Sequence, residues 1–498
     1  MGVLNPAEIV AGGGLVEANT VCRRPSDYGA VLVGPWFEAS DPNALSGNPV
    51  ERAGTRNVGA TAQSSIASRR PIIVNGKLRW DGSDDIMFGS AESTLLSQVT
   101  PPDIPNAEPG KGWTTTGLAL APDGTWWIGN HGKKNEVTAA GETFYAGVVQ
   151  MSADLTTVLR DVRCTTLGVT NSSVQGVAIE PLGGANYNVL FVVADGADLI
   201  VRMSSAGTLI GTLPYSLPNG IAFDIARQNI IVMGTNGAVN WIDKTTGTVN
   251  SSMTIRTITD SPDGLFYDQN GSIYVSGGPN IAGGLLIKYD VATKSARKCW
   301  VLDAARSIEH LHIDLVTGIL TVCNDSYFHN SATAKYPALN TIQRYQLDSL
   351  ASTDIGTKLI VAWTGNMVAQ ATGNTKALLV GGNPNPIANN AIGRGVGIYY
   401  TTNANEIRFT SRIGVADSVS VTWVLPDETV ESNLELVYDA TAGTAILYQN
   451  GVSLGTKTGL PTGTIPSFMY VIGALLDNTG SPANWANVEL RSLLVAGT

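Results

Sequence analysis

A repeat in the middle of the chain constrains the fold more than any other feature. Five segments share one pattern: a polar residue, then a small residue, then alternating apolar residues, a turn and a second apolar run. The second residue is glycine in four segments and histidine in the last, and the spacings between these positions are 59, 44, 44 and 46 residues. The segments begin at Thr116-Gly117, Gln175-Gly176, Asn219-Gly220, Asp263-Gly264 and Glu309-His310.

A third apolar strand follows each segment, as at Val239–Ile242 and Leu286–Tyr289. Three or four short strands in every 40–50 residues or so are typical of the blades of a β-propeller. One such unit cannot bury both of its faces, so several units stack radially and close a ring. We therefore expect an all-β fold in which residues 112–350 form a β-propeller of about five blades.

The flanks of this region lack the repeat. Residues 433–456 alternate between apolar and polar residues, with turns near Gly443 and at Asn450-Gly451, which predicts a hairpin. Asp81-Gly82-Ser83-Asp84-Asp85 in the first flank and Tyr448-Gln449-Asn450-Gly451 in the second resemble concanavalin A-like (laminin G-like) jelly-roll domains. The resemblance implies one β-sandwich in two pieces, continued after the repeats at Lys358–Thr364.

The expected organisation is therefore a jelly roll split by an inserted propeller. Residues 1–34 form an N-terminal arm, residues 35–100 and 357–498 form the two parts of the jelly roll, and residues 112–350 form the propeller. Four prolines between residues 101 and 109 mark the first junction, and insertions succeed at exposed loops whose ends lie close together. Two separate small β domains flanking the propeller are the alternative.

Charge and cysteine content exclude several classes of function. The chain has 31 Lys and Arg against 41 Asp and Glu, a net charge of −10, and no run of basic residues, so we expect no nucleic-acid partner. No apolar stretch of about 18 residues occurs, so we expect no membrane insertion. The N-terminus lacks a secretory pattern. Cys22, Cys164, Cys299 and Cys323 lack metal-site spacing, which indicates reduced thiols and assembly in a cytoplasm.

Four polar residues occupy equivalent positions directly before the repeated glycine or histidine, namely Gln175, Asn219, Asp263 and Glu309. The symmetry of a propeller would place them in a ring at one mouth of the central channel. Carboxylate and amide oxygens are ligands for a hard cation, so this ring is a candidate Ca²⁺ site. Turn formation alone also explains Asn and Asp before glycine.

Leu217-Pro218-Asn219-Gly220 and Ser261-Pro262-Asp263-Gly264 resemble motifs of the gluconolactonase/regucalcin propellers. In that family the Asn and Asp of these motifs bind the metal, which implies a metal-dependent lactonase with Asp263 as the general base. This chain departs from the family in two ways. The family has six blades, and its early metal-binding Glu has no clear counterpart here unless Glu309 substitutes for it.

Other candidate residues are few. No nucleophile elbow, phosphate-binding loop or dinucleotide motif is present, and we assign no catalytic residue. His310 and His312 alternate on one expected strand and so face the same side; polar residues at a blade edge explain the pair better than a metal site. Glycan binding needs exposed aromatic side chains, and the candidates are Trp485, in a loop, and the pair Trp126 and Trp127, of which one is expected to be exposed.

The arm, the jelly roll and the propeller together resemble tail-fibre, baseplate and capsid-surface proteins of tailed bacteriophages. This resemblance implies a non-catalytic virion protein that binds a host-surface receptor or glycan, works as a homo-oligomer, and contacts other virion proteins through its arm. It would be assembled in the host cytoplasm. A capsid decoration protein and the metal-dependent hydrolase are the alternatives.

Overall fold

The computed structural model describes the chain from residue 31 to residue 498 with gaps. The described residues are 31–38, 56–60, 72–74, 77–79, 87–91, 93–102, 115–132, 146–169, 173–194, 197–255, 262–276, 284–302, 308–324, 341–351, 354–368, 376–382, 394–401, 403–413, 418–468, 470–472, 475–476, 482–483 and 488–498. In these residues the chain is all-β, as expected, and its only helical element is the short 3₁₀ turn Thr165–Leu167. No described helix is long and apolar enough to cross a membrane.

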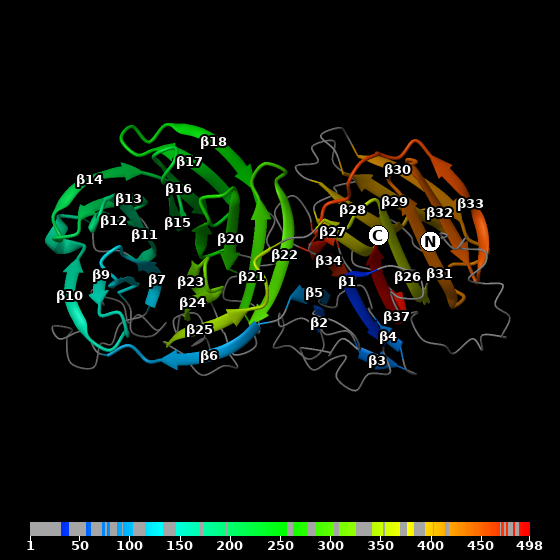
Figure 1. Cartoon of the computed structure of the whole chain (residues 1–498), viewed down its shortest axis with the longest axis horizontal. Coiled ribbons are helices and arrows are strands. Elements are labelled where there is room, and N and C mark those ends of the chain that lie inside the picture. Colours follow the sequence, from blue (N-terminus) through cyan, green and yellow to red (C-terminus); the bar gives the residue numbers. More distant parts are fainter. Residues whose placement is uncertain are drawn as a thin grey trace.

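The described residues between 115 and 347 form five antiparallel units of strands in chain order (Figure 1). The first two units are β7 (Thr115–Leu120), β8 (Trp126–Asn130), β9 (Gly147–Met151) and β10 (Val158–Arg163), and β11 (Val174–Gly183), β12 (Asn186–Val193), β13 (Leu199–Ser204) and β14 (Leu209–Pro214). The third and fourth are β15 (Pro218–Asp224), β16 (Asn229–Gly234), β17 (Ala238–Asp243) and β18 (Val249–Thr254), and β19 (Leu265–Tyr267), β20 (Ser272–Ser276), β21 (Gly284–Asp290) and β22 (Ser295–Leu302). The fifth contains β23 (Ile308–Asp314), β24 (Ile319–Asn324) and β25 (Thr341–Leu347).

The first strands of the five units contact one another in a closed cycle. Contacts join β7 to β11, β11 to β15, β15 to β19, β19 to β23, and β23 back to β7. The repeated glycine explains how these backbones come so close. A Cβ on Gly176 would lie 2.8 Å from the carbonyl oxygen of Asn219, and a Cβ on Gly220 would lie 2.8 Å from that of Asp263. On Gly264 it would lie 2.7 Å from the Cα of His310.

A strand from before the first unit completes the fifth. Strand β6 (Ser93–Val99) pairs antiparallel with β25, which gives a four-stranded sheet in the order β23, β24, β25, β6. Polar side chains join the three strands, because the amide of Asn324 donates to Gln343 at 2.8 Å and that of Gln343 donates to Gln98 at 2.8 Å. The sequence places residues 93–100 in the jelly roll, and this is wrong for β6, which belongs to the fifth unit.

An ion-pair network links the second unit to the third. The buried Glu180 on β11 accepts hydrogen bonds from Arg202 at 2.6 and 2.7 Å, from Asn188 at 2.8 Å and from Lys244 at 2.7 Å. Burial alone would raise the pKa of Glu180, but these donors outweigh it and lower the pKa. The charge on Lys244, which follows β17, therefore helps to join neighbouring sheets.

The flanks of the five units pair with each other in two further groups of strands. One group contains β1 (Val31–Glu38), β3 (Ile72–Val74), β4 (Lys77–Arg79), β26 (Lys358–Met367), β31 (Ser432–Asp439), β32 (Thr444–Gln449), β33 (Val452–Thr458) and β37 (Val488–Gly497). The other contains β2 (Arg56–Ala60), β5 (Met87–Ala91), β27 (Lys376–Gly382), β28 (Gly395–Tyr400), β29 (Glu406–Arg412), β30 (Val419–Val424) and β34 (Tyr470–Ile472). A two-residue pair, β35 (Leu475–Leu476) and β36 (Pro482–Ala483), stands apart.

One buried apolar cluster contains side chains from both groups. Trp363 and Leu436 contribute from the first group, and Ile398 and Phe409 from the second. The two groups therefore form a β-sandwich around a common core. The predicted hairpin is confirmed in β31, β32 and β33, with left-handed backbone at Gly443, Asn450 and Gly451.

Strands that precede the five units in the sequence pair with strands that follow them. Strand β1 pairs with β37, and β5 pairs with β34. Strand β22 of the fourth unit also meets β5 through the single pair Trp300–Ala91. Residues 31–34, which the sequence analysis assigns to the arm, belong instead to β1, which begins at Val31; residues 1–30 lie outside the described residues.

Replacing Gly220 with alanine tests the close contact between first strands. The new Cβ would lie 2.8 Å from the Asp263 carbonyl oxygen and 2.8 Å from the Leu265 Cβ. We expect Gly220→Ala to lower the free energy of unfolding in urea by about 1–3 kcal/mol, as overpacking does. The matched control is Gly211→Ala on β14, which meets nothing within 4 Å and should change stability by less than about 0.5 kcal/mol. Equal effects of the two substitutions would contradict the close approach.

Candidate functional site

The predicted polar residues lie at the start of the first strands. Gln175, Asn219 and Glu309 lie on β11, β15 and β23, and Asp263 comes two residues before β19. Asn219, Asp263 and Glu309 are buried, and Gln175 is half-buried. The four residues therefore occupy matching positions at the start of the first strands, and their arrangement as a ring stays a prediction. The equivalent residue of the first unit, Thr116, donates to the carbonyl oxygen of Val174 at 2.5 Å.

Hydrogen bonds bring two of the four side chains together. The amide nitrogen of Asn219 donates to the Asp263 carboxylate at 2.6 Å and to the carbonyl oxygen of Pro262 at 2.9 Å. Gln175 instead donates to Ser173 at 3.4 Å, within its own strand region. The Asn219 amide nitrogen thus occupies the space between two oxygens. A cation could take that place only if the amide turned its oxygen inward.

The described residues contain no group of three or more His, Cys, Asp or Glu side chains placed to hold a metal ion. Amide and backbone carbonyl oxygens are also ordinary Ca²⁺ ligands. The Ca²⁺ site therefore stays a prediction, with Asn219 and Asp263 as its adjacent members.

Both tryptophans proposed for glycan binding are buried, so the expectation that one would be exposed is wrong. They do point to opposite faces, but each face is covered by a neighbouring unit. Trp127 donates to the hydroxyl of Tyr187 in the second unit at 3.1 Å, and Trp126 packs edge-on against His312 in the fifth. Trp485, the third candidate, lies outside the described residues.

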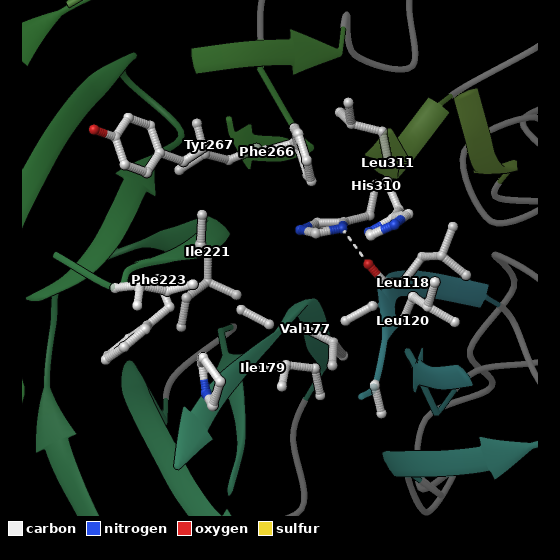
Figure 2. Close-up of a pocket in the computed structure, with 18 of the residues that line it drawn as sticks. Leu118, Leu120, Val177, Ile179, Ile221, Phe223, Phe266, Tyr267, His310 and Leu311 are labelled. Carbon is white, nitrogen blue, oxygen red and sulfur yellow. Dashed lines mark hydrogen bonds between the residues drawn. The ribbon is translucent and has the colours of Figure 1, made fainter. Parts of the chain in front are cut away.

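A cavity that the sequence analysis did not anticipate opens at the other end of the first strands. Its volume is about 410 Å³, and residues from all five first strands line it (Figure 2). The deep wall is apolar and buried, with Leu118, Val177 and Ile221, whereas Leu120 and Ile225 at the wall are 37% and 48% exposed. Leu120 and Ile225 are therefore on the part of the lining that solvent reaches.

Two histidines are among the polar side chains that line this pocket, together with Tyr267 and Gln269. His310 and His312 both lie on β23 and both line the pocket, which confirms that they face the same side. His310 is buried, and its Nδ1 lies 3.1 Å from the carbonyl oxygen of Leu118, so it closes the cycle between β23 and β7. The carbonyl oxygen can only accept, so the ring donates to it in the tautomer that carries the proton on Nδ1.

Burial lowers the pKa of both histidines to about 4. Opposing effects are smaller: the carbonyls of Leu118 and Ile221 raise the pKa of His310, and the charge of Asp314 raises that of His312. Both rings are therefore neutral at pH 7. A signal for this pocket was present in the sequence, since His310 replaces the glycine of the other four units and His312 interrupts an apolar run.

Comparisons with known proteins identify no family. No protein-family model matches the sequence, and no curated protein matches it. Among solved structures, the glutaminyl cyclase of Myxococcus xanthus is similar with a TM-score of 0.36 and 11% identity, over 52% of this chain and 97% of that chain. The β-fructofuranosidase of Schwanniomyces occidentalis is similar with a TM-score of 0.32 and 11% identity, over 84% and 98%.

A third solved structure, the sialidase module CBM40 of Ruminococcus gnavus, is similar with a TM-score of 0.23 and 15% identity, over 28% of this chain and 76% of that chain. These three TM-scores are too low for the likenesses to support a conclusion about this chain.

The lowered pKa values of the histidines predict a pH-dependent stability. In the unfolded chain each histidine takes up a proton near pH 6.5, whereas in the folded chain it does so only near pH 4. Their contribution is therefore complete above pH 6.5 and is lost as the pH falls toward 4. The free energy of unfolding of the unchanged protein should fall between pH 7 and pH 5. In His312→Leu this fall should be smaller by about 1–2 kcal/mol. Urea titrations at both pH values measure this difference; identical losses would contradict it.

Proposed function

We propose that this chain is a virion protein of a tailed bacteriophage, in a tail fibre or baseplate, which binds a receptor or glycan on the host-cell surface. In this proposal the five units are the blades of a five-bladed β-propeller, and the sandwich is a concanavalin A-like jelly roll into which the propeller is inserted. The observation that carries the proposal is the strand pairing of β1 with β37 and of β5 with β34.

This pairing supports a binding role because it holds together the two parts of the sandwich that the five units separate in the sequence. The chain leaves the sandwich after β5, completes the fifth unit with β6, and returns to the sandwich only after β25. Each module is thus fixed at both ends by hydrogen-bonded strands. A surface held in this way loses little conformational entropy when a partner binds.

Copy number provides the second part of the argument. A homo-oligomer on a virion presents many sites at once, so that weak individual contacts add to a strong attachment. The N-terminal residues, outside the described part, would contact other virion proteins in this proposal. No chemical step is needed for such a role.

Competition for adsorption tests the proposal. Purified protein is mixed with candidate bacterial cells, and infection by the phage that encodes it is then scored with and without EDTA. We expect a dose-dependent block of infection. Protein unfolded by heat is the control and should give no block. No block on any susceptible host at saturating protein would contradict the receptor-binding role and favour capsid decoration.

A cation bound in the ring is the second candidate, and the contact between Asn219 and Asp263 favours it. Both side chains are buried and come from neighbouring units, and the Asp263 carboxylate and the Pro262 carbonyl oxygen lie around the Asn219 amide, which would add its own oxygen if it turned. Such oxygens suit Ca²⁺. If the ring hydrolyses lactones, Asp263 is its general base.

Calcium titration separates this candidate from turn formation alone. Ca²⁺ at 100 times its dissociation constant should stabilise the folded protein by about 2.7 kcal/mol, and Asp263→Asn should abolish that gain. Asp154→Asn, at an exposed turn where Asp154 accepts from Ser152, is the matched control and should keep it. A melting temperature that does not respond to Ca²⁺ would rule out the site. Lactone hydrolysis that Asp263→Asn leaves unchanged would rule out the general base.

A further inference from the structure

The apolar pocket at the end of the cycle opposite Asn219 and Asp263 has the size of a ligand site. Its volume of about 410 Å³ falls within the range of about 300–1,000 Å³ that is usual for small-molecule sites. Leu118, Val177, Ile221 and Leu265 are at most 1% exposed and close it on the inside. Such walls accept an apolar body and offer no partner to a charge.

His312 is the polar group that a ligand in this pocket would meet. Its ring is half-buried and is held edge-on by Trp126 and Phe266, each with ring centroids 5.4 Å from its own. The structure records no hydrogen bond between this imidazole and any other residue that it describes. The pKa of about 4 means that the ring is neutral at pH 7, with one nitrogen as donor and one as acceptor.

The neighbouring His310 forms part of the inner wall. Figure 2 shows its imidazole extending between the strand that carries Leu118 and the strand that carries Ile221, with the bond to Leu118 drawn as a dashed line. Its Nε2 is buried and makes no hydrogen bond of acceptable geometry to the described residues. The pocket therefore has two neutral imidazoles on one side, and its other side chains are apolar apart from Tyr267 and Gln269, whose amide is bonded to the backbone of Ile225 and Phe223.

We propose that this pocket binds a small uncharged molecule with an apolar ring system and one hydroxyl group, which hydrogen-bonds to His312. A hydroxyl both donates and accepts, so it matches either tautomer of the imidazole. A carboxylate or an ammonium ion would be buried without a counter-charge, which costs far more than a neutral group does. The site is separate from the receptor-binding role and does not depend on it.

Two ligands of nearly equal shape test whether the hydroxyl group contributes to binding. Equilibrium dialysis of the full chain against 2-naphthol and against 2-methylnaphthalene at pH 7 gives a dissociation constant for each. We expect 2-naphthol to bind about fivefold more tightly, the effect of one neutral hydrogen bond. His312→Leu keeps the apolar volume but removes the partner, so it should abolish the preference.

A variant that fills the opening of the pocket tests where the ligand binds. Leu120 lies at the opening and is 37% exposed, so Leu120→Trp should fold and cover the pocket, weakening the binding of both compounds about tenfold or more. Leu159→Trp is the matched control, because Leu159 is 52% exposed on the outer strand β10 and does not line the pocket; it should bind as the unchanged protein does.

Three results would overturn the proposal. They are the absence of saturable binding of 2-naphthol by the unchanged protein, equal affinity of the unchanged protein for the two compounds, and unchanged affinity in Leu120→Trp. The thermal unfolding of each variant is recorded alongside, so that a loss of binding is attributed to the pocket only in a folded protein.

Discussion

Close approach of five backbone strands is the constraint on which the rest of the structure depends. In each of the first four units, a glycine lies where the first strand contacts the first strand of the following unit. A Cβ at that glycine would overlap the neighbouring backbone or its side chains. The fifth strand has His310 at that position. Its side chain turns inward and bonds to Leu118 of the first strand, so the residue that breaks the repeat also makes the last connection of the cycle.

The same arrangement covers both faces of the inner strands of the first unit. Trp126 and Trp127 point in opposite directions and are both buried, one against the fifth unit and the other against the second. The charged Glu180 is buried between the second and third units and has three donors. Polar and aromatic residues that would be exposed on a single sheet become contacts between sheets here. The two ends of the first strands are then the places where the cycle opens.

The sequence predicted the parts of the fold that are local. The glycine repeat, the strand that follows each segment, and the turns at Gly443 and Asn450-Gly451 depend on short-range rules, and the structure contains all of them. It did not predict the pairing of β6 with β25, because residues 93–99 show no alternation and their partner lies about 250 residues away. It also missed the pocket. The contact between Asn219 and Asp263 could be predicted because the repeat makes them equivalent, whereas the pocket depends on side chains of five strands meeting at once.

Trapping the pairing of β6 with β25 by a disulfide tests most directly how the strand before the first unit completes the fifth. Thr94 and Gln346 are opposite each other in this pair, so Thr94→Cys with Gln346→Cys should form an intramolecular disulfide on mild oxidation, seen as a mobility shift under non-reducing conditions. Thr94→Cys with Arg344→Cys is two residues out of register and should stay reduced. A disulfide in the first pair alone is the predicted result. Free thiols in both pairs, or equal oxidation of both, would contradict the completion of the fifth unit by β6.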